Sequence, residues 1–121
     1  MSIERHGMGP RLSDMVIYAP SHTGRLVYLA GQVAEDRNAD IGAQTRSVLA
    51  QIDRLLGEAG TDKSRILSAT IYLADMADYT AMNAQWDAWV PKGETPARAT
   101  VEAKLAHPAY KVEIQLVAAA G

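Results

Sequence analysis

The clearest pattern in the chain is a one-sided, largely apolar stripe between residues 40 and 60. Its members recur at helical spacing and are Ile41, Thr45, Val48, Leu49, Ile52, Leu55, Leu56 and Ala59. A stripe of this kind predicts an amphipathic helix that packs on a core. Asp40 is a favourable N-cap, and Gly60 suits the left-handed position that follows many helices. We therefore expect the helix to begin after Asp40 and to end before Gly60.

A second helix is predicted between Asp75 and Pro91. Asp75 is the expected N-cap, and Asp78 is placed to complete a capping-box-like pair. The side chains at i, i+3, i+7 and i+10 are Tyr79, Met82, Trp86 and Trp89. We interpret this stripe as core packing, and the proline and the glycine at 93 end the helical pattern.

Alternation of apolar and polar side chains predicts strands over residues 15–18, 25–33, 66–74, 98–105 and 110–119. The first two are interpreted as the start of a meander. Residues 1–9 are expected to form a loose arm, because glycines and a proline interrupt regular structure there. The order of elements predicts a single α+β domain over residues 1–121, a two-layer sandwich with two helices on one face of a mixed sheet.

The 98–105 strand has an arginine directly after a proline-led entry. Pro96 fixes φ and donates no ladder hydrogen bond, so it belongs at the start or edge of a strand. From there Ala99, Val101, Ala103 and Leu105 are expected to face the core. The opposite, polar face would carry Arg98, Thr100, Glu102 and Lys104. Glu113 is one of the alternating polar residues of the last strand, so Arg98 and Glu113 are expected to lie on the same face of the sheet, the one that the helices leave uncovered. Ser68 and Thr70 are expected on this face as well. Such a face must meet water or another subunit.

Composition narrows the function classes. The chain has 121 residues, a net charge of −2 and no cysteine, which excludes disulfides and thiol catalysis. The acidic balance gives no support for nucleic-acid binding. His6, His22 and His107 are scattered without ligand spacing, so no metal site is expected. No window is long and apolar enough to span a membrane, and a cytoplasmic location is the default expectation.

Several short segments together carry a resemblance to a known family. They are Gly31-Gln32, Gln44-Thr45, Ala59-Gly60 with Ile66 and Thr70, Leu73–Met76 with Asn83, Pro96–Val101, and Val112-Glu113-Ile114. From about Pro10 to Ala118 the chain resembles the RidA (YjgF) family of reactive-intermediate deaminases. The segments Trp86–Val90 and Pro108–Glu113 resemble its YoaB-like branch.

The resemblance implies a chorismate-mutase-like fold and a homotrimer with clefts between subunits. It also implies hydrolysis of 2-imino acids and their enamine tautomers, such as 2-aminoacrylate and 2-iminobutanoate, to 2-keto acids and ammonia, without a cofactor. Arg98 matches the family's carboxylate-binding arginine, and Glu113 matches its site glutamate. The other substrate-binding positions carried over are Leu12, Ala30, Gly31 and Thr100. Leu12 stands where relatives commonly have tyrosine, and Ala30 where they often have serine.

The chemistry of the two principal residues fits this reaction. An arginine presents a planar fork that matches a carboxylate, and binding the carboxylate of an imino acid fixes its electrophilic carbon. We expect Glu113 to orient a water molecule and accept its proton. Alternatively, Arg98 and Glu113 form an ordinary solvated ion pair, and Asn83, the predicted supporting residue, only braces a loop. A binding protein for small carboxylates without turnover is the second functional hypothesis, and a nuclease, disfavoured by charge, is the third.

Overall fold

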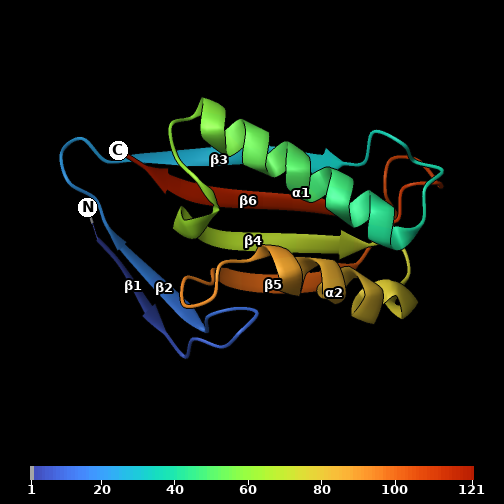
Figure 1. Ribbon diagram of the computed structural model, residues 1–121, viewed down its shortest axis with the longest axis horizontal. Coiled ribbons are helices and arrows are strands. Elements are labelled where there is room, and N and C mark those ends of the chain that lie inside the picture. The colour runs from blue at the N-terminus through green and yellow to red at the C-terminus, as the bar shows by residue number, and fades with distance from the viewer. Residues whose placement is uncertain (1) are drawn as a thin grey trace.

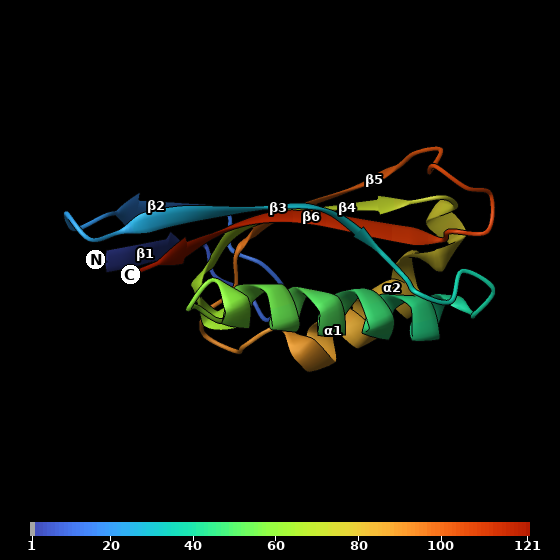
Figure 2. The same cartoon turned by 90° about the horizontal axis from the view of Figure 1, so that it is seen from above.

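The computed structural model describes residues 2–121 and shows a sheet covered on one face by helices (Figure 1). The strands of the sheet lie in the order β3 (Arg25–Val33), β6 (Val112–Ala120), β4 (Ile66–Leu73) and β5 (Ala97–Glu102). β6 is antiparallel to both of its neighbours, whereas β5 is parallel to β4. Helices α1 (Ile41–Glu58) and α2 (Tyr79–Trp89) lie together on one side of this sheet (Figure 2). The predicted two-layer α+β architecture with a mixed sheet is confirmed.

A separate ribbon of two strands lies beside the main sheet. β1 (Ser2–His6) pairs antiparallel with β2 (Met15–Ala19), and both project from the end of the sheet in Figure 1. The predicted loose arm is therefore wrong for Ser2–His6, while Met1 lies outside the described residues. The predicted meander is also wrong, because β2 pairs with β1 and β3 pairs with β6. The glycines and the proline of the 7–10 segment make the turn between β1 and β2, so they do not mark an unstructured arm.

The helix α1 forms as its local signals predict. The Asp40 side chain accepts a hydrogen bond of 2.8 Å from the amide of Ala43, and Gly60 adopts a positive φ of 77° after the last turn. The buried side of α1 presents Val48, Ile52 and Leu56 to the sheet. Each such fully buried aliphatic side chain stabilises the fold by about 1.5–3 kcal/mol.

The start of α2 differs from the prediction. Asp75 caps a short 3-10 turn, Met76–Asp78, by accepting from the amide of Ala77, and α2 begins only at Tyr79. Among the described residues, the Asp78 side chain makes no capping hydrogen bond, so the predicted capping box is wrong. Of the aromatic stripe, Met82 and Trp86 are fully buried, whereas Tyr79 is 37% exposed. Tyr79 therefore lies at the border of the core and not within it.

The faces of β5 are reversed relative to the prediction. Arg98 pairs in register with Ala69, and Thr100 pairs with Ile71, both of which are core residues of β4. Arg98 and Thr100 therefore point to the helix-covered side, and Val101 is 42% exposed on the open side. The prediction from the alternating pattern was wrong because it assumed that the charged guanidinium of Arg98 must face water. An arginine can bury its stem and stack its flat guanidinium on an aromatic ring from another element.

This reversal separates the two residues expected to share a face. Glu113 pairs in register with Tyr72 on β4, one position away from the core pair Ile71 and Ile114. Glu113 thus lies on the open face, together with Ser68 and Thr70 as predicted, while Arg98 lies under α2. The expectation that Arg98 and Glu113 share one face of the sheet within a chain is wrong. Within residues 2–121, neither α-helix is long and apolar enough to cross a membrane.

Candidate active site

Arg98 is a half-buried cation on the inner side of the edge strand β5. Its guanidinium carbon lies 5.3 Å from the centroid of the Trp86 ring, which supports it from α2. Nε and Nη1 are buried and have no hydrogen-bond partner within residues 2–121. Burial lowers the pKa of the guanidinium, although an arginine stays protonated at neutral pH. The unmet donors make this group suited to binding an anion of planar shape.

Other polar groups with unmet hydrogen-bonding capacity lie near Arg98. The Thr100 hydroxyl and both amide atoms of Asn83 are buried, and none of them has a partner of ordinary hydrogen-bond geometry in the described part of the chain. Asn83 is only 2% exposed. Buried polar groups are normally paired, so these three side chains mark a place where water or a ligand completes the hydrogen bonds.

Tyr79 connects this group to the surface. The amide of Asn83 lowers the pKa of the Tyr79 hydroxyl, and the positive charges of Arg98 and Arg11 act in the same direction against burial. Tyr79 also lines a hollow of about 470 Å³ together with Arg11, Leu12 and Asp14. Leu12 and Tyr79 therefore border the same hollow, and Tyr79 also interacts with Arg98.

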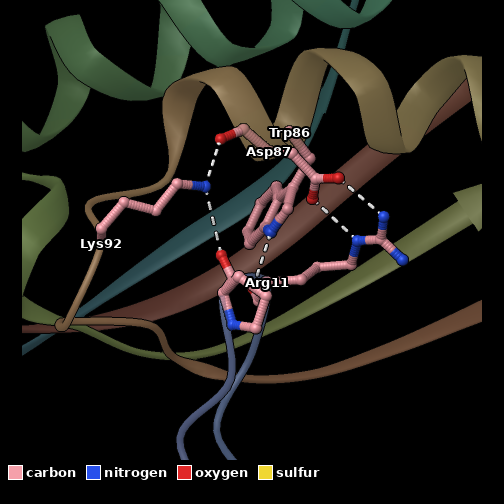
Figure 3. Close-up of polar contacts among 5 residues, drawn as sticks. Arg11, Trp86, Asp87 and Lys92 are labelled. Carbon is pink, nitrogen blue, oxygen red and sulfur yellow. Dashed lines mark hydrogen bonds and ion pairs between the residues drawn. The ribbon is translucent and has the colours of Figure 1, made fainter.

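The segment that carries Leu12 is tied to α2 by several hydrogen bonds (Figure 3). Arg11 donates from Nε and Nη2 to the two carboxylate oxygens of Asp87 at 2.7 and 2.6 Å. The indole Nε1 of Trp86 donates to the carbonyl of Arg11 at 2.9 Å. Lys92 donates to the carbonyls of Pro10 and Asp87 at 3.3 and 2.7 Å. We call residues 9–14 the strap.

The strap is also fastened to the start of β5. The hydroxyl of Ser13, which is buried, donates to the carbonyl of Thr95 at 2.6 Å, and the Ser13 amide donates to the carbonyl of Pro96 at 2.8 Å. Thr95 in turn donates from its hydroxyl to the carbonyl of Gly9 at 3.3 Å. These contacts fix the entry of the strand from which Arg98 projects.

Glu113 belongs to a second hollow, on the open face of the sheet. This hollow of about 310 Å³ is lined by Gly31, Tyr72, Ala103, Lys104, Leu105, Glu113 and Gln115. A register shift in β3 between Leu29 and Gln32 places Ala30 and Gly31 at this point, and Ala30 is exposed. The predicted site residues thus form two groups, Arg98 with Thr100 under α2 and Gly31 with Glu113 on the open face.

Three features of the first group were not found from the sequence. They are the support of Arg98 by Trp86, the ion pair between Arg11 and Asp87, and the position of Tyr79. Arg11 and Asp87 are 76 residues apart, and no local pattern predicts that they meet. The sequence placed Trp86 in the predicted core stripe and Asp87 beside it in the helix, but it did not indicate their contacts with Arg98 and Arg11. For the residues that the structure describes, no cluster of three or more His, Asp or Glu side chains could hold a metal ion.

Comparison with known proteins identifies the family. The sequence model of the Endoribonuclease L-PSP family matches residues 11–120. The RutC family protein YoaB of Escherichia coli strain K12 is 50% identical, with 98% of this chain and 99% of that protein covered. The chain belongs to this family. The prediction of RidA (YjgF) membership is confirmed.

The YjgF family also includes solved structures with the same fold. A YjgF family protein from Neisseria meningitidis is 48% identical, with a TM-score of 0.77, and the match covers 100% of this chain and 97% of that one. This match confirms the fold class predicted from the sequence. A family member from Acinetobacter baylyi, the 3-aminoacrylate deaminase RutC, is 35% identical over 84% of this chain and 85% of its own length.

Proposed function

We propose that the protein hydrolyses 2-imino acids and their enamine tautomers to 2-keto acids and ammonia. The observation that carries the proposal is the half-buried guanidinium of Arg98, whose Nε and Nη1 find no partner among residues 2–121. Nε and Nη1 point in different directions, and each forms a fork with Nη2; a carboxylate supplies the two parallel acceptors that one such fork requires. The Acinetobacter relative is named for the deamination of 3-aminoacrylate, which is itself an enamine carboxylate, and this name supports the same reaction class here.

The proposed reaction needs a carboxylate clamp and a proton acceptor. Arg98 holds the carboxylate, and so fixes the position of the adjacent C2 carbon of the protonated imine. A water molecule adds to C2 while Glu113 accepts its proton, and the same proton then passes to the nitrogen. The C2–N bond breaks as Glu113 accepts the remaining hydroxyl proton, so that ammonia leaves and a 2-keto acid remains. The balance is one protonated imino acid and one water giving one 2-keto acid, one ammonia and one proton, which Glu113 returns to water.

Because Arg98 and Glu113 lie on opposite faces of the sheet in one chain, the proposed site joins two chains. We propose a homotrimer in which Arg98, on the edge strand β5, meets the open face of a neighbouring subunit where Glu113 lies. Exposed apolar side chains on that open face support the assembly, with Tyr28 at 72% and Leu26 at 49% exposure. A monomer would leave these groups in water, and such surfaces commonly form interfaces.

A trapping assay tests the activity. An amino-acid oxidase generates the imine in the presence of semicarbazide, and the protein competes with semicarbazide for it. Wild type is expected to suppress semicarbazone formation, whereas Arg98→Ala and Glu113→Ala do not. Saturable binding of a 2-keto acid without any suppression by wild type would instead indicate a carboxylate-binding protein, and cleavage of RNA would indicate a nuclease.

Mixing the two inactive variants tests the shared site. If each site combines Arg98 of one subunit with Glu113 of another, then randomly mixed trimers of the two variants regain intact sites. Equal mixing restores about a quarter of the wild-type sites, because each of the two residues is intact with a probability of about one half. If both residues came from one chain, mixing would restore nothing, and the proposed assembly of the site would be wrong.

A further inference from the structure

Arg11 is held in two ways by consecutive residues of α2. Its side chain forms a bidentate pair with Asp87, and its backbone carbonyl accepts the indole N–H of Trp86 (Figure 3). The pair is partly exposed, with 37% of the Arg11 side chain and 36% of the Asp87 side chain accessible. A pair of this exposure contributes little to stability by itself, about 1 kcal/mol or less. Its geometry, with two parallel hydrogen bonds, defines orientation more than it contributes energy.

The same tryptophan supports Arg98. One edge of the Trp86 indole is bound to the strap, and the guanidinium of Arg98 lies over its ring at 5.3 Å. A continuous series of contacts therefore runs from Asp87 through Arg11 and Trp86 to Arg98. The ring cannot turn without breaking the hydrogen bond to the strap, and the strap cannot move without breaking the pair with Asp87.

Among the described residues, Nε and Nη1 of Arg98 have no hydrogen-bond partner, and the Thr100 hydroxyl has none either. The guanidinium also interacts with the hydroxyl of Tyr79 and with the carboxylate of Asp87. The indole of Trp86 lies 5.3 Å from its central carbon and, together with Tyr79, helps to set the plane of the guanidinium. A carboxylate is bound bidentately only in that plane, so the orientation of the ring determines how well the substrate is held.

We propose that Arg11 and Asp87 are positioning residues for substrate binding, which fix the Trp86 indole and through it the plane of the Arg98 guanidinium. The expected effect on kinetics rests on the proposed function. The expected effect on the orientation of the Arg98 guanidinium does not depend on that function. Neither Arg11 nor Asp87 needs to touch the substrate. The alternative is that the pair only fastens the β1–β2 ribbon to the rest of the fold.

Three variants distinguish a role of the Arg11–Asp87 pair in positioning Trp86 from a role in fastening the β1–β2 ribbon. Asp87→Asn and Arg11→Lys weaken the bidentate pair, and Trp86→Phe keeps a ring beneath Arg98 while removing the donor to the strap. The matched control is Arg54→Gln. Arg54 forms a side-chain ion pair with Glu58 on the surface of α1, with a distance of 3.2 Å between Nη1 and Oε1. Thermal unfolding of each variant establishes that the comparison is made between folded proteins.

The first measurement is independent of activity. The Nε–H signal of Arg98, identified by its loss in Arg98→Lys, is expected to be shifted by the ring current of Trp86 in wild type. In Asp87→Asn and Arg11→Lys this signal is expected to move toward the position of an unstacked arginine, and in Arg54→Gln it is expected to stay. Trp86→Phe changes the ring itself and serves as the reference for an altered ring current. An unchanged Arg98 signal in both Asp87→Asn and Arg11→Lys would overturn the inference, whatever the protein catalyses.

The second measurement is kinetic. Imine hydrolysis is expected to show a KM raised about fivefold in Asp87→Asn, with kcat altered less than about twofold, because substrate binding is weakened before the chemical step. The double variant Arg11→Lys with Asp87→Asn should be no worse than the more severe single variant, since both act through one pair. Additive effects, or a fall in kcat at unchanged KM, would contradict positioning. Absence of activity in wild type would refute the proposed function, and the Arg98 signal would still decide the inference.

Discussion

The carboxylate of Glu113 lies against the backbone of Gly31, in the space that a Cβ at position 31 would fill. A Cβ built there would lie 2.8 Å from the Glu113 Cδ, closer than real Cβ atoms approach. Gly31 does not adopt a positive φ, unlike Gly60, so the requirement for glycine is one of space and not of backbone conformation. Position 31 therefore controls where the proposed proton acceptor can lie.

Gly31→Ala is expected to displace the Glu113 side chain and to lower kcat while leaving the fold intact. The clash involves the end of a flexible side chain, so the carboxylate moves and the strand does not. A displacement of about 1 Å in a catalytic group can cost about a hundredfold in rate. Steady-state kinetics and a thermal melt check this together. A variant with wild-type kcat would show that the place of Glu113 beside Gly31 has no role in the reaction.

A matched glycine substitution on α1 is expected to raise stability and to leave kcat unchanged. Gly57 lies in the helix and is exposed, and beyond its chain neighbours and the adjacent helix backbone an added Cβ would have no atom of the described residues within 4 Å. Gly57→Ala should therefore raise the free energy of unfolding by about 0.5–1 kcal/mol, chiefly by restricting the unfolded chain. Urea denaturation measures it, and imine hydrolysis should stay at the wild-type rate. A loss of stability here would contradict the described course of α1.

Replacing Arg98 should separate stability from function. Arg98→Met keeps an apolar stem on the Trp86 ring and removes a half-buried cation whose Nε and Nη1 have no hydrogen-bond partner in residues 2–121, which is costly to bury. We expect a melting temperature equal to or above that of wild type, with no detectable imine hydrolysis. Arg98→Lys keeps the charge but loses the planar fork, and should lower kcat/KM by about a hundredfold. Destabilisation by Arg98→Met would show that Arg98 has a structural role.

Acid unfolding should report the pair of Arg11 and Asp87. The hydrogen bonds from Arg11 hold the pKa of Asp87 below its usual value, so the folded state favours the carboxylate. The stabilisation is fully present above the unfolded pKa of about 3.9 and is lost as the pH falls through the lower folded pKa.

Wild type is therefore expected to be more stable than Asp87→Asn at pH 5–7, by at most about 1 kcal/mol because the pair is partly exposed. The difference should vanish at the acid end of a series of urea titrations. In an Arg11→Met background, the substitution Asp87→Asn should have little effect on stability at any pH in the series, because the carboxylate has already lost its partner. A difference that grows as the pH falls would have the wrong sign for this account.

The sequence predicts best what depends on neighbouring residues. Asp40 and Gly60 bound α1 because capping requires only local geometry, and β6 follows its alternating pattern. The face of Arg98 could not be predicted in this way, because it is decided by Trp86 on another element. The pair of Arg11 and Asp87 likewise exists only after the strap has folded against α2. The proposed site positions come from the resemblance, whereas their division between two faces of the sheet required the structure.

The placement of Arg98 and Glu113 on opposite faces of one sheet has an evolutionary consequence. Each residue has its own surroundings, Trp86 for the arginine and Gly31 for the glutamate, so that mutation can alter one without repacking the other. Under the proposed function, a lineage that lost Glu113 would retain the carboxylate-binding arginine and could become a metabolite sensor or carrier. A lineage that changed the environment of Arg98 would explore new substrates with the proposed proton acceptor preserved. The proposed recognition and chemistry could therefore diversify as separate traits.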